Sequence, residues 1–141
     1  MSAPIKTLTL LQSAARTALP TIADQNNFSY SALTVAIDIT AVGTGGNVPA
    51  LTFTVQGKDL VSGKYFNIAQ TSALAAVGTT FIQICPEITA AAAASAGSAT
   101  TSNDNTTLAK VCALVPKTWR VVVTGTAGTA TYSVGAELSD C

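Results

Sequence analysis

The chain has 141 residues, of which 48% are hydrophobic and 10% are charged, with seven Lys and Arg, seven Asp and Glu, and no His. The absence of histidine excludes His-based catalytic triads and His metal ligands. The formal net charge is zero and the basic residues are scattered singly, so the sequence lacks the basic patch that phosphate backbones and anionic membranes require. We therefore expect no nucleic-acid partner and no membrane partner. The length fits a single domain over residues 1–141.

Composition favours an all-β protein. Threonine is abundant, with 22 residues, and many Val and Ile side chains occur in short, spaced clusters that suit pleated strands. No apolar run approaches the roughly 18 residues of a membrane span, and the N-terminus lacks the pattern of a secretory signal. We therefore expect the protein to act where it is made, or in an assembly that incorporates it there.

The first elements in chain order are an N-terminal segment and two strands. Residues 5–12 predict a first strand within a partly extended arm over residues 1–27. Within residues 31–42, large apolar side chains occupy every second position from Leu33 to Ile39, and the run from Leu51 to Gln56 repeats this alternation after a Gly-rich turn. We expect these two strands to form a hairpin.

The second half of the chain predicts two shorter strands, an insertion and a final pair of strands. Residues 64–70 and 79–85 supply the shorter strands. An Ala/Ser/Thr-rich stretch over residues 89–110 lacks the side chains of a core, so we expect a surface insertion there. Residues 117–124 and 129–138 alternate on either side of a Gly-containing turn and predict a C-terminal hairpin.

These elements predict an antiparallel β-sandwich of jelly-roll or Ig-like type with about six to eight strands. Its inward-facing residues should be the apolar members of the alternating strands. The predicted core is Leu33, Val35, Ile37, Ile39, Leu51, Phe53, Val55, Trp119, Val121, Val123, Tyr132 and Val134.

Catalytic motifs are absent from the sequence. The acidic residues form no close pair suited to glycosidase or metal chemistry, and no GxSxG, SxxK, P-loop or dinucleotide-binding motif occurs. Lys58-Asp59 lies at a turn, where an Asp side chain commonly bonds to nearby backbone. Arg120 faces away from Trp119 and could bind a carbohydrate or carboxylate, but a solvated arginine beside a core tryptophan is the favoured interpretation. We expect no enzyme activity, no cofactor and no metal site.

The three cysteines match no metal-binding spacing. A Cys85–Cys112 disulfide would close a loop of about 27 residues and stabilise the fold by roughly 3.5 kcal/mol. The alternative is two reduced thiols. Cys141 could form an intersubunit bond, but a terminal residue is usually mobile, so a free thiol is the favoured interpretation.

Six segments of the chain resemble a group of small structural proteins of tailed bacteriophages. The resemblance extends from Thr7 to Leu138 but leaves out the stretch from Ser95 to Leu114. Its most specific pieces are TVQGKD followed by SGKY, and PKTWRV followed by TYSVGA. The segments are TLTLLQSAARTA, SALTVAIDITAV, LTFTVQGKDLVSGKYFNI, GTTFIQICPEITAAA, VPKTWRVVVTG and TATYSVGAEL.

This resemblance implies a virion component, and an abundant small β-sandwich of this kind is expected to be a capsid decoration or cement protein. Such a protein binds the mature shell on the outer surface of the virion and bridges neighbouring capsomers. Its partners would be the major capsid protein and further copies of itself, as a dimer or trimer. Extended segments are natural clamps for such contacts. The proposed interaction residues are Ile5, Leu8, Leu10, Ala91, Ser95 and Thr107.

Two other functions remain open from the sequence. A tail, baseplate or vertex protein would share the fold but occur in fewer copies. A carbohydrate-binding module would expose an aromatic platform, for which the available residues are Tyr30, Tyr65, Phe66 and Tyr132.

Overall fold

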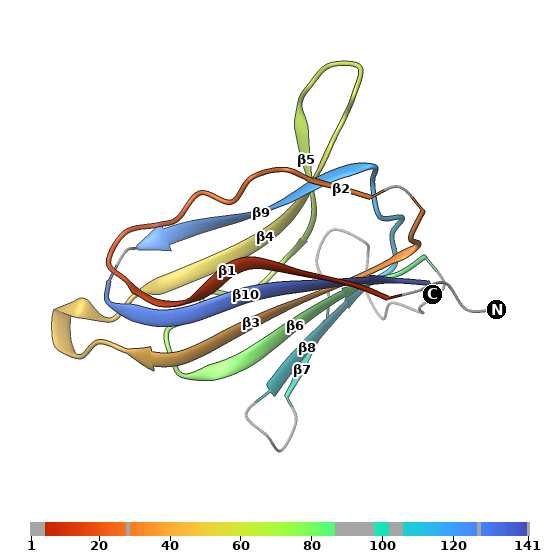
Figure 1. The fold of residues 1–141 in the computed structure, drawn as a ribbon. Helices are drawn as coiled ribbons and strands as arrows, with labels where there is room; N and C mark the ends of the chain where they lie inside the picture. Colours follow the sequence, from red (N-terminus) through yellow and green to blue (C-terminus); the bar gives the residue numbers. More distant parts are fainter. Residues whose placement is uncertain (1–4, 28, 87–97, 102–105, 127, 141) are drawn as a thin grey trace.

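The structure is a computed structural model that describes residues 5–27, 29–86, 98–101, 106–126 and 128–140. Two β-sheets pack face to face, and the described residues contain no α-helix (Figure 1). One sheet has six strands in the order β1-β10-β3-β6-β8-β7, and the other has four in the order β2-β9-β4-β5. The elements are β1 (Lys6–Arg16), β2 (Gln25–Asn26), β3 (Ala32–Val42), a 3₁₀ turn (Gly45–Asn47), β4 (Ala50–Lys58), β5 (Tyr65–Gln70), β6 (Gly78–Ile84), β7 (Ser98–Thr101), β8 (Thr106–Val111), β9 (Thr118–Thr126) and β10 (Ala130–Ser139).

The prediction of an all-β sandwich is confirmed. Every strand pair is antiparallel except β6 with β8, which run parallel. The described residues contain ten strands rather than six to eight. The additional strands include the two-residue β2 and the four-residue β7, which are too short to leave an alternating pattern in the sequence.

Both predicted hairpins are wrong. The strands β3 and β4 are consecutive in the chain but lie in opposite sheets, and the same is true of β9 and β10. Each connection is therefore an arch between the sheets. The two arches are joined by hydrogen bonds, because the Gly43 N–H donates to the Thr129 carbonyl (2.7 Å) and the Thr129 N–H donates to the Asn47 carbonyl (2.8 Å).

Gly125 lies where β9 approaches the start of β4. Its φ of +118° is a conformation that L side chains rarely adopt, and a Cβ at this position would overlap the carbonyl oxygen of Ala50. Glycine is therefore required for β9 to stay paired with β4 up to its arch.

The N-terminal segment is extended and lies along its own sheet. Strand β1 pairs with β10 from Lys6 opposite Leu138 to Arg16 opposite Ala130, with two irregularities in the register. The Arg16 guanidinium donates to the backbone carbonyls of Gln12 and Tyr132, which fastens the end of the strand. After β1 the chain crosses to the other sheet, where β2 pairs with β9.

The expected insertion over residues 89–110 contains sheet strands in its described part. Strand β8 pairs parallel to β6 and antiparallel to β7, so it is an internal strand of the six-stranded sheet. The insertion therefore ends earlier than the sequence indicated. The Thr and Val residues of TTLAKV favour a strand, and the Asn and Ser residues before them obscured it.

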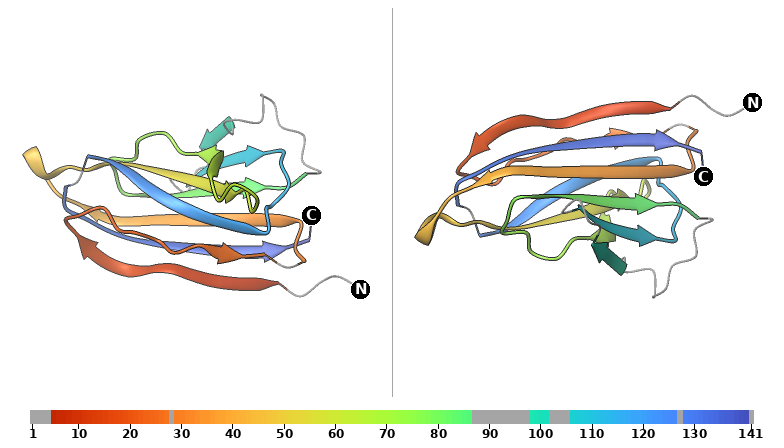
Figure 2. Two further views of the ribbon diagram at one scale, coloured as in Figure 1. Left: turned by 90° about the horizontal axis from the view of Figure 1, so that it is seen from above. Right: turned by 90° about the horizontal axis from the view of Figure 1, so that it is seen from below.

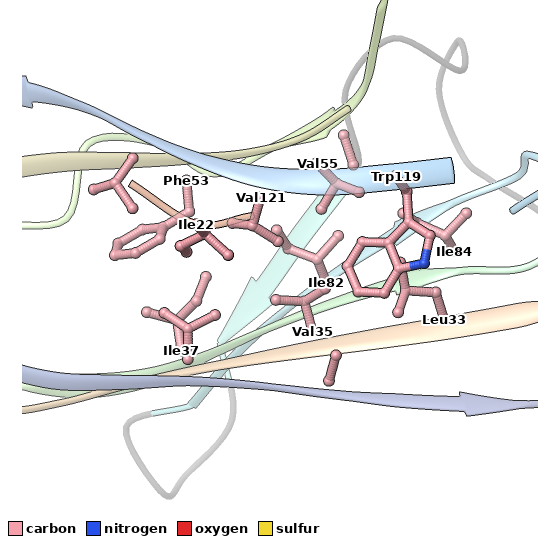
Figure 3. Packing of buried hydrophobic residues seen from close by; sticks show 14 of the residues in the cluster. Ile22, Leu33, Val35, Ile37, Phe53, Val55, Ile82, Ile84, Trp119 and Val121 are labelled. Atoms are coloured by element: carbon pink, nitrogen blue, oxygen red, sulfur yellow. The ribbon is translucent and has the colours of Figure 1, made fainter. Parts of the chain in front are cut away.

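The core lies between the inner faces of the two sheets (Figure 3). All twelve residues of the predicted core are buried. The indole of Trp119, from β9, packs against Leu33 and Ile84 of the opposite sheet (Figure 3). Nearby, the rings of Phe53 and Tyr132 meet edge to face, with their centroids 5.8 Å apart.

Two buried aromatic side chains also carry polar atoms. The Nε1 of Trp119 is buried and has no acceptor among the described residues. Burial raises the pKa of the Tyr132 hydroxyl, and the positive charge of Arg16 partly opposes this effect. Because the folded-state pKa is raised, Tyr132 contributes stability below its unfolded pKa, and this contribution is lost as the pH rises through the folded value.

Substitution of Trp119 tests how much the sandwich depends on this side chain. Trp119→Ala should lower the free energy of unfolding by about 3–5 kcal/mol, because it leaves a large cavity between the sheets. Trp119→Phe should cost less, since it keeps a ring and removes the unpartnered N–H. Chemical denaturation measures both, with Lys117→Ala as the surface control. Equal stability of Trp119→Ala and this control would place the indole outside the core.

Candidate functional site

The connection between β4 and β5 projects from the body of the sandwich (Figure 1). Residues 59–64, here called the finger, carry two adjacent apolar side chains at the tip. Leu60 is 62% exposed and Val61 is 97% exposed. Large apolar side chains presented in this way on a projecting turn are typical of a contact surface.

Asp59 organises the finger through its side chain. Its carboxylate accepts hydrogen bonds from the Ser62 hydroxyl (2.6 Å) and from the N–H groups of Val61 and Ser62 (3.2 Å each). The backbone closes the turn, because the Asp59 N–H donates to the Lys64 carbonyl and the Gly63 N–H donates to the Asp59 carbonyl (2.8 Å each). Gly63 has a φ of +74°, which favours glycine. The prediction that Asp59 serves turn formation is confirmed.

These hydrogen bonds also act on the ionisation of Asp59. The Ser62 hydroxyl and then the two N–H groups stabilise the carboxylate and lower its pKa. The carboxylate is therefore charged and bonded at neutral pH, which keeps the finger ordered in the unbound chain.

A polar cluster, here called the brace, supports the finger at its base. The guanidinium carbon of Arg120 lies 3.4 Å from the centroid of the Tyr65 ring, and the Nε of Arg120 donates to Gln56 Oε1 (2.9 Å). The Tyr65 hydroxyl donates to Asp24 Oδ2 (2.7 Å), and Lys58 Nζ lies 3.7 Å from the same oxygen. The brace thus joins β4, β5, β9 and the segment before β2.

Strand register explains why these side chains meet. Gln56 on β4 is paired with Arg120 on β9, and Lys58 is paired with Tyr65 on β5. Paired residues point to the same side of a sheet, and Trp119 next to Arg120 points into the core. The brace therefore lies on the outer face of the four-stranded sheet.

The brace accounts for several residues considered as ligand contacts. Arg120 is engaged in the chain's own structure, stacked on one face of Tyr65, instead of being simply solvated.

The other candidates for an aromatic platform differ in exposure. Tyr132 is buried and Tyr30 is half-buried against the core, whereas Phe66 is 48% exposed. Among the candidates for an aromatic platform, Phe66 is therefore the most accessible side chain.

The predicted interaction residues lie apart from the finger. Ile5 is 62% exposed just before β1, whereas Leu8 and Leu10 are half-buried and pack against the core. Thr107 lies in β8, where its backbone pairs with Thr80 and Thr101. Ala91 and Ser95 lie outside the described residues.

The cysteines differ from both sequence alternatives. Cys85 is disulfide-bonded, whereas Cys112 is a free and exposed thiol whose Sγ lies 3.3 Å from the carbonyl oxygen of Pro86. A Cys85–Cys112 bond is therefore excluded, and so is a reduced Cys85. Cys141 lies outside the described residues.

The described part of the chain has no group of three or more His, Cys, Asp or Glu residues arranged to hold a metal ion. It also has no helix long and apolar enough to span a membrane.

Leu60 and Val61 were missed as functional candidates in the sequence. The available signal was two adjacent apolar residues enclosed by Asp59 before them and Ser62-Gly63 after them. Turn-forming residues on both sides of an apolar pair indicate that the pair is exposed at a tip.

Comparison with known proteins adds no functional assignment, because no protein-family model, curated protein or solved structure matches the chain.

The finger makes a prediction about pH. An NMR titration should find the Asp59 pKa below the ordinary range of an aspartate, and Ser62→Ala should move it back towards that range. Because folding lowers the pKa of Asp59, its ionised carboxylate stabilises the folded chain at any pH above the ordinary pKa of an aspartate. This stabilisation is lost as the pH falls through the pKa of Asp59 in the folded chain. An unchanged pKa in Ser62→Ala would show that the hydroxyl does not hold the carboxylate.

The brace makes a separate prediction about coupling. A double-mutant cycle with Arg120→Ala and Tyr65→Ala should give a coupling energy of about 0.5–1 kcal/mol in chemical denaturation. Tyr65→Phe is the matched control, because it keeps the ring under the guanidinium and removes only the hydrogen bond to Asp24. Additive effects of the two alanine substitutions would refute the stacking as a source of stability.

Proposed function

We propose that this chain is a structural protein of a tailed-phage particle, and specifically a decoration protein that binds the mature capsid and bridges neighbouring capsomers. The observation that carries the proposal is the ordered finger, whose tip exposes Leu60 (62%) and Val61 (97%). TVQGKD and SGKY lie on either side of Leu60 and Val61, and PKTWRV supplies Arg120 to the brace. Three of the four most specific segments of the resemblance thus contribute residues to the finger or the brace, whereas TYSVGA lies in β10.

A non-enzymatic role fits this arrangement. The finger is preorganised by backbone and carboxylate hydrogen bonds, so little conformational entropy remains to be lost when it meets a surface. Many weak contacts of this kind act together when copies cover a lattice. A subunit that recognises only the mature shell stabilises that state by mass action.

The proposed partners are the major capsid protein and further copies of the chain, as a dimer or trimer on the outer surface of the virion. We propose neither a nucleic-acid partner nor a membrane partner, because the seven basic residues are balanced by seven acidic ones and are scattered along the sequence. Assignment to a tail, baseplate or vertex is the alternative, and it differs in the number of copies per particle.

Copy number tests the proposal. Quantitative mass spectrometry of purified particles should find this chain at a simple fraction of the major shell protein. That ratio is expected only if the chain covers the lattice. A few copies per particle would assign it to the tail or a vertex, and its absence from the particles would overturn the virion assignment.

A further inference from the structure

The outer face of the six-stranded sheet contains a hollow at its centre. Ala36 on β3 is paired with Gly135 on β10 on one side and with Phe81 on β6 on the other. Their chain neighbours are buried, so these three residues face outward. Two small residues in a row beside a phenylalanine leave a groove of about 250 Å³, bordered by Leu8 and by Glu137.

The groove and the finger have complementary properties. The groove is lined largely by apolar atoms and has a volume sufficient for a branched aliphatic side chain, and Val61 is 97% exposed at the finger tip. Lys64 lies at one end of the finger, and Glu137 lies at the rim of the groove. Neither has an ion-pair partner among the described residues, where the salt bridge found joins Lys58 to Asp24.

The finger of one molecule points away from its own groove. It belongs to the four-stranded sheet, whereas the groove lies on the outer face of the opposite sheet. Figure 1 shows the finger rising from the side of the sandwich opposite to the six-stranded sheet, and Figure 2 shows the same molecule from above and below. A contact between the two surfaces therefore needs two molecules.

We infer that the finger of one copy docks into this groove on a second copy, with Val61 and Leu60 over Ala36 and Gly135, and with Lys64 beside Glu137. This contact joins two different surfaces, so it is heterologous, and it forms a ring if the rotation closes or an open array if it does not. The inference deepens the proposed function, on whose self-association it rests, and names the surfaces that would produce it.

Sedimentation of the full-length chain over a concentration series tests the inference. Val61→Asp should weaken self-association at least about tenfold, because it places a charge in an apolar groove. Leu114→Asp is the matched control, since Leu114 is an apolar residue, 75% exposed, in the connection between β8 and β9. It should leave association unchanged. A wild-type chain that stays monomeric, or equal losses in the two variants, would overturn the inference.

A charge exchange adds a test of the orientation. Lys64→Glu and Glu137→Lys should each weaken association, and the two substitutions combined in one chain should restore it, because the opposite charges then meet again. Failure of the combined variant to recover would refute the proposed pairing of finger and groove.

Two further measurements separate this inference from its alternatives. Binding to vesicles of anionic phospholipid that Val61→Asp abolishes, without any change in self-association, would show that the tip contacts a membrane and would overturn the inference. Particle composition is measured independently. If the chain self-associates through the finger but is absent from the particles, the inference is supported and the proposed function is refuted. If the chain is monomeric but is present in the particles at a simple fraction of the shell protein, the proposed function is supported and the inference is refuted.

Discussion

The structure depends on the alternation of β9, which passes through the centre of the four-stranded sheet. Trp119 enters the core and packs against the six-stranded sheet, and the next residue, Arg120, must then point outward. There it stacks on Tyr65 and supports the base of the finger. One strand thus links the packing of the two sheets to the position of the exposed tip, so a change of register in β9 would disturb both.

The finger combines two requirements that oppose each other. Leu60 and Val61 are exposed, so their burial contributes little to the stability of the isolated chain. Ordering the turn that carries them also costs conformational entropy. The bonds to the Asp59 carboxylate offset that cost locally. In the proposed function, this hydrogen-bonded turn presents its apolar tip to a partner.

Sequence patterns predicted the strands and the core well, but not the way in which strands pair. Alternation around Val35 and Val121 indicates which side chains face inward, and burial then follows. The alternation of side chains does not indicate whether the chain after Val42 returns within the same sheet or crosses to the other sheet. That choice depends on backbone contacts between residues distant in sequence, such as Gly43 with Thr129. The brace was missed for the same reason, because Asp24, Tyr65 and Arg120 meet only after the sheets form.

The pairing of the first and last strands has a practical consequence. Lys6 at the start of β1 is the neighbour of Leu138 near the end of β10, so the first and last strands begin and end at the same corner of the sandwich. A short peptide joining them would give a circular permutant with new ends in an exposed loop and the same pairing of strands. A second protein fused at either end would also be displayed from one site, while the opposite end of the sandwich keeps its interlocked arches.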